Sequence, residues 1–172
     1  LAHSKSNHIS DSSYDENKRW PDGLSPFGFK VVKEMNKQGV MIDISHVSDA
    51  AFMKVLELSD APVVATHSSL RHFTPGWERN VSDEMLIALA ENGGVIQLCF
   101  GSDFVANRKD NPDIQVSVKN VVDHIDRVRD LVGIDHVGFG SDFDGEVPLP
   151  EDINDVSKFP NLIEELLIRG YT

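Results

Sequence analysis

The sequence predicts an α/β fold, and more specifically part of a (β/α)8 barrel of the TIM type. Apolar runs of strand length alternate with helix-like stretches along the 172 residues, which is typical of parallel strands joined by crossover helices. Polar side chains follow the predicted strands at their carboxyl ends, where barrels of this kind place functional groups. Four clear strands and one stub are about half of those in a complete barrel. We therefore expect residues 1–172 to form a partial barrel domain.

The first half of the chain begins with a strand stub over residues 1–3 and a polar loop over 8–21. A helix is expected over 26–38, because Ser25 suits the N-cap, Pro26 suits the first helical position and Gly39 can end the helix. The elements that follow are a buried strand, a helix and a second buried strand, over residues 40–46, 49–58 and 62–67.

The second half continues the same alternation. A loop over 68–81 leads to a helix that Ser82 can cap and that the Asn-Gly-Gly run at 92–94 ends. A strand over 95–100 and a loop over 102–111 come next. Val118, Val121, Val122, Ile125 and Val128 then recur at helical spacing up to Gly133. The remaining expected elements are a strand over 136–140, a Pro-rich loop and a helix over 158–169.

Composition narrows the class of protein. Hydrophobic residues make up 40% and charged residues 26%, as in globular chains. The formal net charge of −12 argues against nucleic acid as a partner and favours cations. No apolar stretch reaches the roughly 18 residues of a membrane span, and no leader is visible. The single cysteine, Cys99, lies in an apolar run and is interpreted as a buried hydrophobic residue. These observations favour a cytoplasmic location.

Two histidines mark a candidate metal site. His46 ends the predicted strand 40–46, and His67 ends the predicted strand 62–67. Because the carboxyl ends of parallel strands emerge at one edge of a sheet, the two imidazoles should reach the same place. Asp142 follows a third predicted strand and adds a carboxylate. Imidazole nitrogens and carboxylate oxygens are common zinc ligands, so the pattern indicates a metal centre.

A structural interpretation competes at each of these positions. One histidine after an apolar run is usually a hydrogen-bonded structural residue, and only the combination of two with a carboxylate favours a site. His3 lies so near the chain start that it could be frayed. Arg79, in a loop, would by itself be a solvated cation. Four further histidines are interpreted as structural, namely His8, His72, His124 and His136.

Several segments of the chain form a recognisable set. They are GVMIDISHVS (39–48), APVVATHSS (61–69), RNV (79–81) and GFGSDFDG (138–145), with GLSPFG (23–28) and DVSKFP (155–160) in support. Together they resemble the renal (membrane) dipeptidase family, peptidase family M19. The similarity extends over nearly the whole chain and includes the 21-residue step from His46 to His67.

The resemblance implies a zinc dipeptidase on a metal-dependent hydrolase barrel, with two zinc ions bridged by a hydroxide that attacks the peptide bond. By position, His46 and His67 would ligate the second zinc. Asp142 would be the acid/base carboxylate and would also attract the ammonium group of a dipeptide. Arg79 would hold the terminal carboxylate of the substrate, and His3 would contact the scissile carbonyl oxygen. A homodimer is implied for the full-length protein.

The family also carries a His-x-Asp pair and a bridging Glu, which have no counterpart here. We therefore expect the chain to be the C-terminal portion of the barrel without its first strands and last helices. Alone, it should be inactive, and it should be poorly soluble or bind zinc weakly. Two alternatives stay open: another metal-dependent hydrolase acting on an amide, lactone or phosphoester, and a non-catalytic relative that binds a small ligand.

Overall fold

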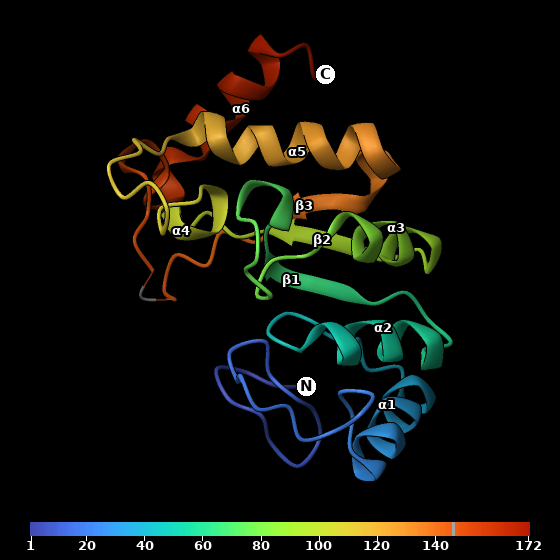
Figure 1. The fold of residues 1–172 in the computed structure, drawn as a ribbon. Helices are drawn as coiled ribbons and strands as arrows, with labels where there is room; N and C mark the ends of the chain where they lie inside the picture. The colour runs from blue at the N-terminus through green and yellow to red at the C-terminus, as the bar shows by residue number, and fades with distance from the viewer. Residues whose placement is uncertain (146) are drawn as a thin grey trace.

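A three-stranded parallel sheet lies at the centre of the computed structural model, which describes residues 1–145 and 147–172. The strands are β1 (Val64–Ser68), β2 (Val95–Leu98) and β3 (Val137–Phe139), in the spatial order β1-β2-β3. Figure 1 shows the strands stacked in this order between two groups of helices. The predicted α/β class is confirmed, and the sheet is consistent with part of a barrel.

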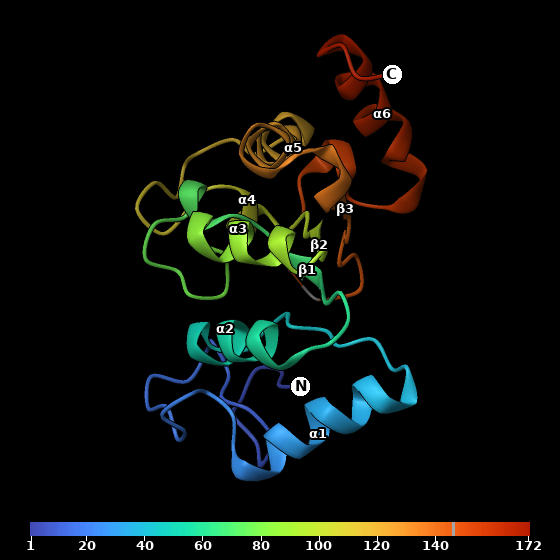
Figure 2. The same ribbon diagram turned by 90° about the vertical axis from the view of Figure 1, so that its right-hand side faces the viewer.

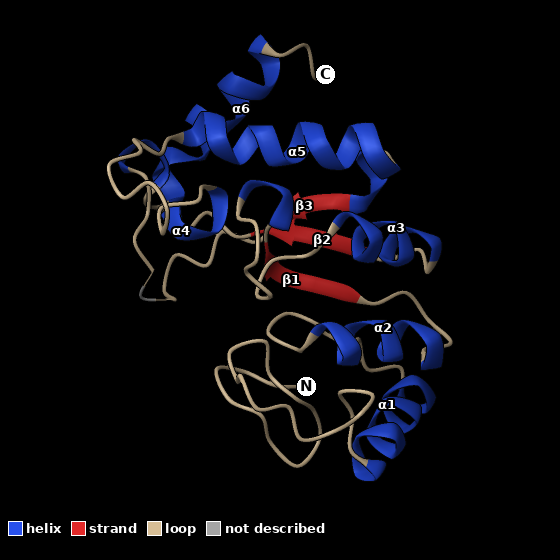
Figure 3. Ribbon diagram, in the orientation of Figure 1, coloured by secondary structure: helices blue, strands red, loops and turns tan. Residues whose placement is uncertain are grey.

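Helices cover the sheet and extend from both of its edges, as Figures 2 and 3 show. Helices α3 and α5 pack against the strands and against each other, and α6 packs on α5. On the β1 side, α2 is followed by α1. The helices are α1 (Pro26–Gln38), α2 (Asp49–Leu58), α3 (Asp83–Glu91), α4 (Ser102–Val105), α5 (Val118–Val132) and α6 (Phe159–Ile168), with 3-10 turns at Arg71–Phe73, Ile134–His136, Glu151–Ile153 and Val156–Lys158.

The predicted helix ends are confirmed where a cap was recognised. The Ser25 side chain accepts a hydrogen bond from the Gly28 backbone N–H at 2.9 Å, and Gly39 ends α1 in the left-handed region, with φ of 67°. The Ser82 side chain accepts from Met85 N at the start of α3. These local hydrogen bonds satisfy backbone groups that would otherwise lack partners, which is why the helices begin and end there.

The predicted strand over 40–46 is wrong. Only Asp43 pairs with Val64, as an isolated parallel bridge carried by the hydrogen bonds Val64 N to Ile42 O and Ile44 N to Val64 O. Val40 and Met41 are exposed, and Ser45 and His46 turn away from the ladder. A strand cannot continue through His46, because its φ of 70° lies outside the β region.

Three smaller predictions are also corrected. Residues 1–3 form no strand, and the terminal amino group of Leu1 lies 3.5 Å from Asp43 O. The predicted loop over 102–111 begins with the short helix α4. The last strand is shorter than 136–140, because a 3-10 turn ends at His136 and leaves only Val137–Phe139 in the ladder.

One apolar core joins the sheet to the helices. Its fully buried members include Phe52 from α2, Leu86 from α3, Leu98 from β2 and Val128 from α5. Cys99 is free and buried, as predicted. Within the described part of the chain, no helix combines the length and apolarity that crossing a bilayer requires.

Candidate active site

The imidazoles of His46 and His67 meet at one edge of the sheet. Their Nε2 atoms are 2.8 Å apart, and the ring centroids are 4.8 Å apart. His67 belongs to β1, while His46 is carried by the turn that follows the bridge at Asp43. The predicted convergence of the two rings is therefore confirmed, although the strand expected to deliver His46 does not form.

A chain of hydrogen bonds determines which nitrogen of His67 carries the proton. Thr66 Oγ1 donates its hydrogen to Asp43 Oδ2 at 2.7 Å. Thr66 Oγ1 can therefore only accept from His67 Nδ1, which lies 2.7 Å away. Burial raises the pKa of Asp43, but hydrogen bonds from Ser45 and Thr66 outweigh this effect and the pKa falls below its usual value. The ionised carboxylate thus holds His67 with Nδ1 protonated and leaves Nε2 as a free lone pair facing His46.

His46 is kept neutral by its surroundings. Burial lowers its pKa to about 3, and the nearby Arg79 and His67 act in the same direction. Burial also lowers the pKa of His67. The ring of His3 stacks on that of His46, with centroids 4.3 Å apart. Neutral imidazoles have the lone pairs that a metal ion requires, so the pair is chemically suited to bind one.

The donor set fits half of a metal site. His46 Nδ1 is buried and has no hydrogen-bond partner within residues 1–145 and 147–172, whereas His67 Nδ1 is oriented through Thr66 as metal-ligating histidines commonly are. No group of three or more His, Cys, Asp and Glu side chains able to hold a metal occurs among the residues described. Two imidazoles can provide only part of a zinc coordination shell, so further ligands have to come from elsewhere.

Arg79 is hydrogen-bonded directly to His67 of this pair. Its side chain is only 3% exposed, and it donates to Ser68 Oγ at 2.7 Å and to the main-chain oxygen of His67 at 2.6 Å. The guanidinium carbon lies 5.1 Å from the centroid of the Phe104 ring. Burial lowers the pKa of Arg79, but a guanidinium stays protonated in proteins. The structure therefore places a fixed cation beside the imidazoles. Arg79 is not the solvated loop cation that its position in the sequence alone would suggest.

Asp142 lies in the loop that follows β3 and has a left-handed backbone conformation, with φ of 63°. Its Oδ2 is 3.8 Å from the Cys99 sulfur, which donates to it. The Asp142 carboxylate acts to raise the pKa of His67, so it lies within electrostatic reach of the histidine pair. All five residues singled out in the sequence thus belong to one neighbourhood.

The loop over residues 3–15 covers the histidines and carries a residue that the sequence did not reveal. Ser12 Oγ donates to His3 O at 2.6 Å, and Ser13 N donates to His46 O at 2.8 Å. These bonds hold Tyr14 with its ring centroid 5.8 Å from that of His46. Burial raises the pKa of Tyr14. A tyrosine in a polar loop gives no periodic signal, so only the fold could place it here.

The four remaining histidines have structural surroundings. His124 is buried in α5, where Nδ1 accepts from Leu70 N at 3.0 Å and Nε2 donates to Val105 O at 3.2 Å. His136 Nδ1 lies 2.8 Å from Gly94 O. The rings of His8 and His72 stack or pack against neighbouring phenylalanines. These contacts agree with the structural interpretation of all four.

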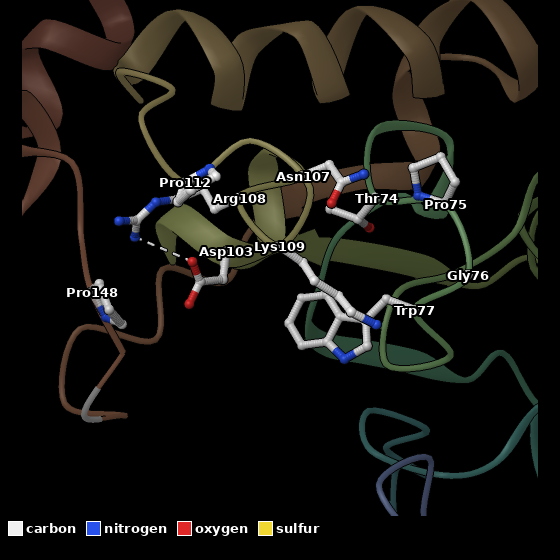
Figure 4. A pocket seen from close by; sticks show the side chains of 10 residues that line it. All are labelled: Thr74, Pro75, Gly76, Trp77, Asp103, Asn107, Arg108, Lys109, Pro112 and Pro148. Carbon is white, nitrogen blue, oxygen red and sulfur yellow. Dashed lines mark hydrogen bonds and ion pairs between the residues drawn. The ribbon is translucent and has the colours of Figure 1, made fainter.

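A cavity of about 630 Å3, here called the rim pocket, lies between the loops that follow β1 and β2 (Figure 4). It excludes the histidine pair. Trp77, which lines it, packs edge-on against Phe104 with centroids 4.7 Å apart, and Phe104 contacts Arg79 on the site side. Its charged and polar lining comes from Asp103, Asn107, Arg108 and Lys109. Trp77 and Phe104 thus connect the lining of the rim pocket to Arg79.

Comparison with protein families gives a match over the full length of the chain. The matching model is that of the membrane dipeptidases, peptidase family M19, and it covers residues 1–172. Dipeptidase tcpJ of Claviceps purpurea (strain 20.1) is 42% identical over 170 residues, which are 99% of this chain and 39% of that protein. The chain thus spans well under half the length of this curated relative.

Solved structures show the same fold. A metallo peptidase from Rhodobacter sphaeroides, crystallised with a phosphinate mimic of the dipeptide L-Ala-D-Ala, superposes with a TM-score of 0.87 at 34% identity, over 98% of this chain and 48% of that one. An amidohydrolase from Pseudomonas aeruginosa gives a TM-score of 0.85 at 28% identity, over 100% of this chain and 57% of that one.

Proposed function

Because the chain belongs to the membrane dipeptidase family, peptidase family M19, we propose that the full-length protein hydrolyses dipeptides with zinc. The observation that carries this proposal is the meeting of His46 and His67, 2.8 Å apart, beside the buried cation of Arg79. A metal site next to a fixed positive charge suits a substrate with a free carboxylate close to its scissile bond.

His46 and His67 are the residues that would hold zinc, through Nε2 of each ring. When bound, the metal would supply Lewis-acid polarisation of the peptide carbonyl and a water of lowered pKa as the nucleophile, a bridging hydroxide if two ions are present. The ligands of the first zinc and the bridging carboxylate belong to the rest of the barrel, which this proposal includes. We thus assign residues 1–172 to a partial (β/α)8 barrel domain.

The other site residues bind the substrate and move the proton. Arg79 binds the terminal carboxylate and, through His67 O, holds the metal ligand in register with it. His3, stacked on His46, donates to the scissile carbonyl oxygen as negative charge develops there. Asp142 takes the proton of the attacking water and returns it to the leaving amine. The same carboxylate attracts the substrate ammonium, so only two residues fit between the two charges.

L-Ala-D-Ala is the first substrate to test. The metallo peptidase from Rhodobacter sphaeroides was solved with a mimic of this dipeptide and is 34% identical to this chain over the aligned residues. The likeness to an amidohydrolase from Pseudomonas aeruginosa supports a second candidate, hydrolysis of another amide by the same site. An amide without an adjacent carboxylate would make no use of Arg79.

The test is a substrate panel on the zinc-loaded full-length protein, comparing L-Ala-D-Ala with its C-terminal amide, an N-acyl amino acid, a lactone and a phosphodiester. Hydrolysis of the free dipeptide alone is expected, and Asp142→Asn should lower kcat by roughly 100-fold or more. Equal hydrolysis of the dipeptide and its amide would favour the amidohydrolase reading. No hydrolysis of any compound would overturn both enzymatic proposals and favour a binding protein.

The proposal also includes a homodimer, which light scattering tests, and a cytoplasmic location, which cell fractionation tests.

A further inference from the structure

Cys99, at the end of β2, is fixed by backbone hydrogen bonds on both sides. Its N–H donates to Ser68 O at 3.0 Å towards β1. Towards β3, Phe100 N donates to Ser141 O at 3.0 Å, which continues the pairing of the two strands beyond their ends. The segment before Asp142 is therefore aligned with Cys99. The thiol, which is fully buried, donates to Asp142 Oδ2 with 3.8 Å between sulfur and oxygen.

The thiol is a donor and not a nucleophile. Burial raises the pKa of Cys99 to about 12, and the Asp142 carboxylate acts in the same direction. A thiol of this kind remains protonated and unreactive at neutral pH. Its proton is consequently available to the carboxylate, for which an S–H group is a weak but directional donor.

Gly145 closes the other side of the carboxylate. A Cβ atom on Gly145 would lie 2.6 Å from Asp142 Cγ, closer than real Cβ contacts come, so the carboxyl group rests directly on the glycine backbone. Gly145 N also donates to Asp142 O at 3.1 Å, which closes the turn. The carboxylate is thus held between a thiol and a residue without a side chain, and its rotation about the Cβ–Cγ bond is restricted.

We propose that Cys99 is a positioning residue for Asp142, whose carboxylate it holds by the S–H to Oδ2 hydrogen bond against Gly145. The proposal rests on the proposed function, in which Asp142 transfers the proton. A general acid/base must be held within hydrogen-bond reach of the atoms it serves, so a freely rotating carboxylate would act less often in the right orientation. Nothing in the sequence indicates a site residue at the end of the strand predicted over 95–100, because a cysteine in an apolar run is interpreted as part of the core.

The kinetic test uses Cys99→Ala and Cys99→Ser in the zinc-loaded full-length protein, with L-Ala-D-Ala as substrate. Cys99→Ala should lower kcat roughly tenfold with KM within about twofold, because orientation and not substrate binding is lost. Cys99→Ser keeps a donor and should restore kcat to within about threefold of the wild type. Ile96→Val, a buried change on the same strand, is the control for lost packing and should leave kcat unchanged.

A second readout does not depend on activity. The difference between the infrared spectra of wild type and Cys99→Ser isolates the S–H stretching band of Cys99. In the wild type this band should lie at the lower frequency of a hydrogen-bonded thiol, and in Asp142→Ala it should move to higher frequency. An unchanged band in Asp142→Ala would overturn the proposal, even if the protein proves inactive on dipeptides.

The outcomes separate the two proposals. A wild type that hydrolyses dipeptides, with Cys99→Ala equally active, overturns the positioning role alone. A loss of kcat in Cys99→Ala that Cys99→Ser does not repair, with an equal loss in Ile96→Val, shows a packing effect and also overturns it. A wild type without dipeptidase activity removes the proposed function, while the infrared band still reports whether the contact exists.

Discussion

The Nε2 atoms of His46 and His67 lie 2.8 Å apart, and the proton between them belongs to His46. This follows from Thr66, whose Oγ1 donates to Asp43 and therefore accepts a hydrogen bond from the protonated Nδ1 of His67, which leaves His67 Nε2 without a proton. If both Nε2 atoms bound a metal, as proposed, the His46 proton would have to occupy Nδ1, which is buried and has no hydrogen-bond partner among the described residues. In the proposed metal site the two rings would therefore be unequal ligands, with His67 the better oriented of the two.

The first prediction concerns zinc affinity. His46→Ala and His67→Ala should each abolish stoichiometric zinc binding at the second site. Thr66→Val, which breaks the link from Asp43 to His67, should weaken it roughly tenfold. His8→Ala is the control, because His8 stacks on Phe27 away from the pair. Zinc content after dialysis against a competing chelator measures the effect. Full retention of zinc in His67→Ala would contradict the assignment.

The second prediction concerns Arg79. Arg79→Lys keeps the charge but cannot bond both Ser68 Oγ and His67 O while facing a carboxylate. We expect kcat/KM for a dipeptide to fall roughly 100-fold, with most of the change in KM. The dipeptide amide, already a poor substrate, should be affected much less. Steady-state kinetics with both compounds checks this. Equal losses for both would show that Arg79 only supports the fold.

The third prediction concerns His124 and pH. Burial lowers the pKa of His124 in the folded protein to about 3, so between about pH 6.5 and pH 3 the unfolded chain binds one more proton than the folded chain. The free energy of unfolding therefore decreases as the pH is lowered through this range, by up to about 1.4 kcal/mol per pH unit. His124→Leu should lose this contribution. It should also cost about 2–4 kcal/mol at neutral pH, because Leu70 N and Val105 O lose their partner. Urea unfolding of both proteins at several pH values compares the slopes, and equal slopes would contradict the prediction.

The fourth prediction concerns the attachment of α6. Arg169 donates to Asp123 and Asp126 of α5 through Nη1 and to Glu165 through Nε. Arg169→Lys loses this fork, so α6 should open more readily, with amide exchange in residues 159–168 faster by roughly tenfold. Lys54→Ala, which removes a solvent-exposed ion pair with Glu57, should leave this exchange unchanged. Hydrogen exchange by mass spectrometry resolves the two variants.

Much of the fold was predictable because its signals are local. Caps such as Ser25 and Ser82 act within one turn, so the helix ends could be predicted from neighbouring residues. The strand over 40–46 could not be excluded in this way, since an apolar run does not reveal whether a ladder partner continues beside it. The one-pair bridge at Asp43 depends on the turn at His46, which is a tertiary feature.

In the candidate site too, some residues could be predicted from the sequence and others could not. Strand direction led us to expect His46 and His67 in one place, and their rings do meet, although a turn and not a strand carries His46. Tyr14 and Cys99 were missed, since one lies in a polar loop and the other in an apolar run. Their positions depend on contacts between distant segments, such as Ser13 N with His46 O. No pattern in the sequence reports contacts of that kind.

The left-handed backbone at His46 and Asp142 has an evolutionary consequence. A side chain in that region costs about 1 kcal/mol relative to glycine, so at both positions the protein retains a residue that its own backbone disfavours. Selection of random variants for heat resistance alone should enrich glycine at 46, and asparagine or glycine at 142, as catalysis disappears. The frequency of these replacements, with and without a simultaneous demand for hydrolysis, would show how strongly chemistry keeps each residue in place.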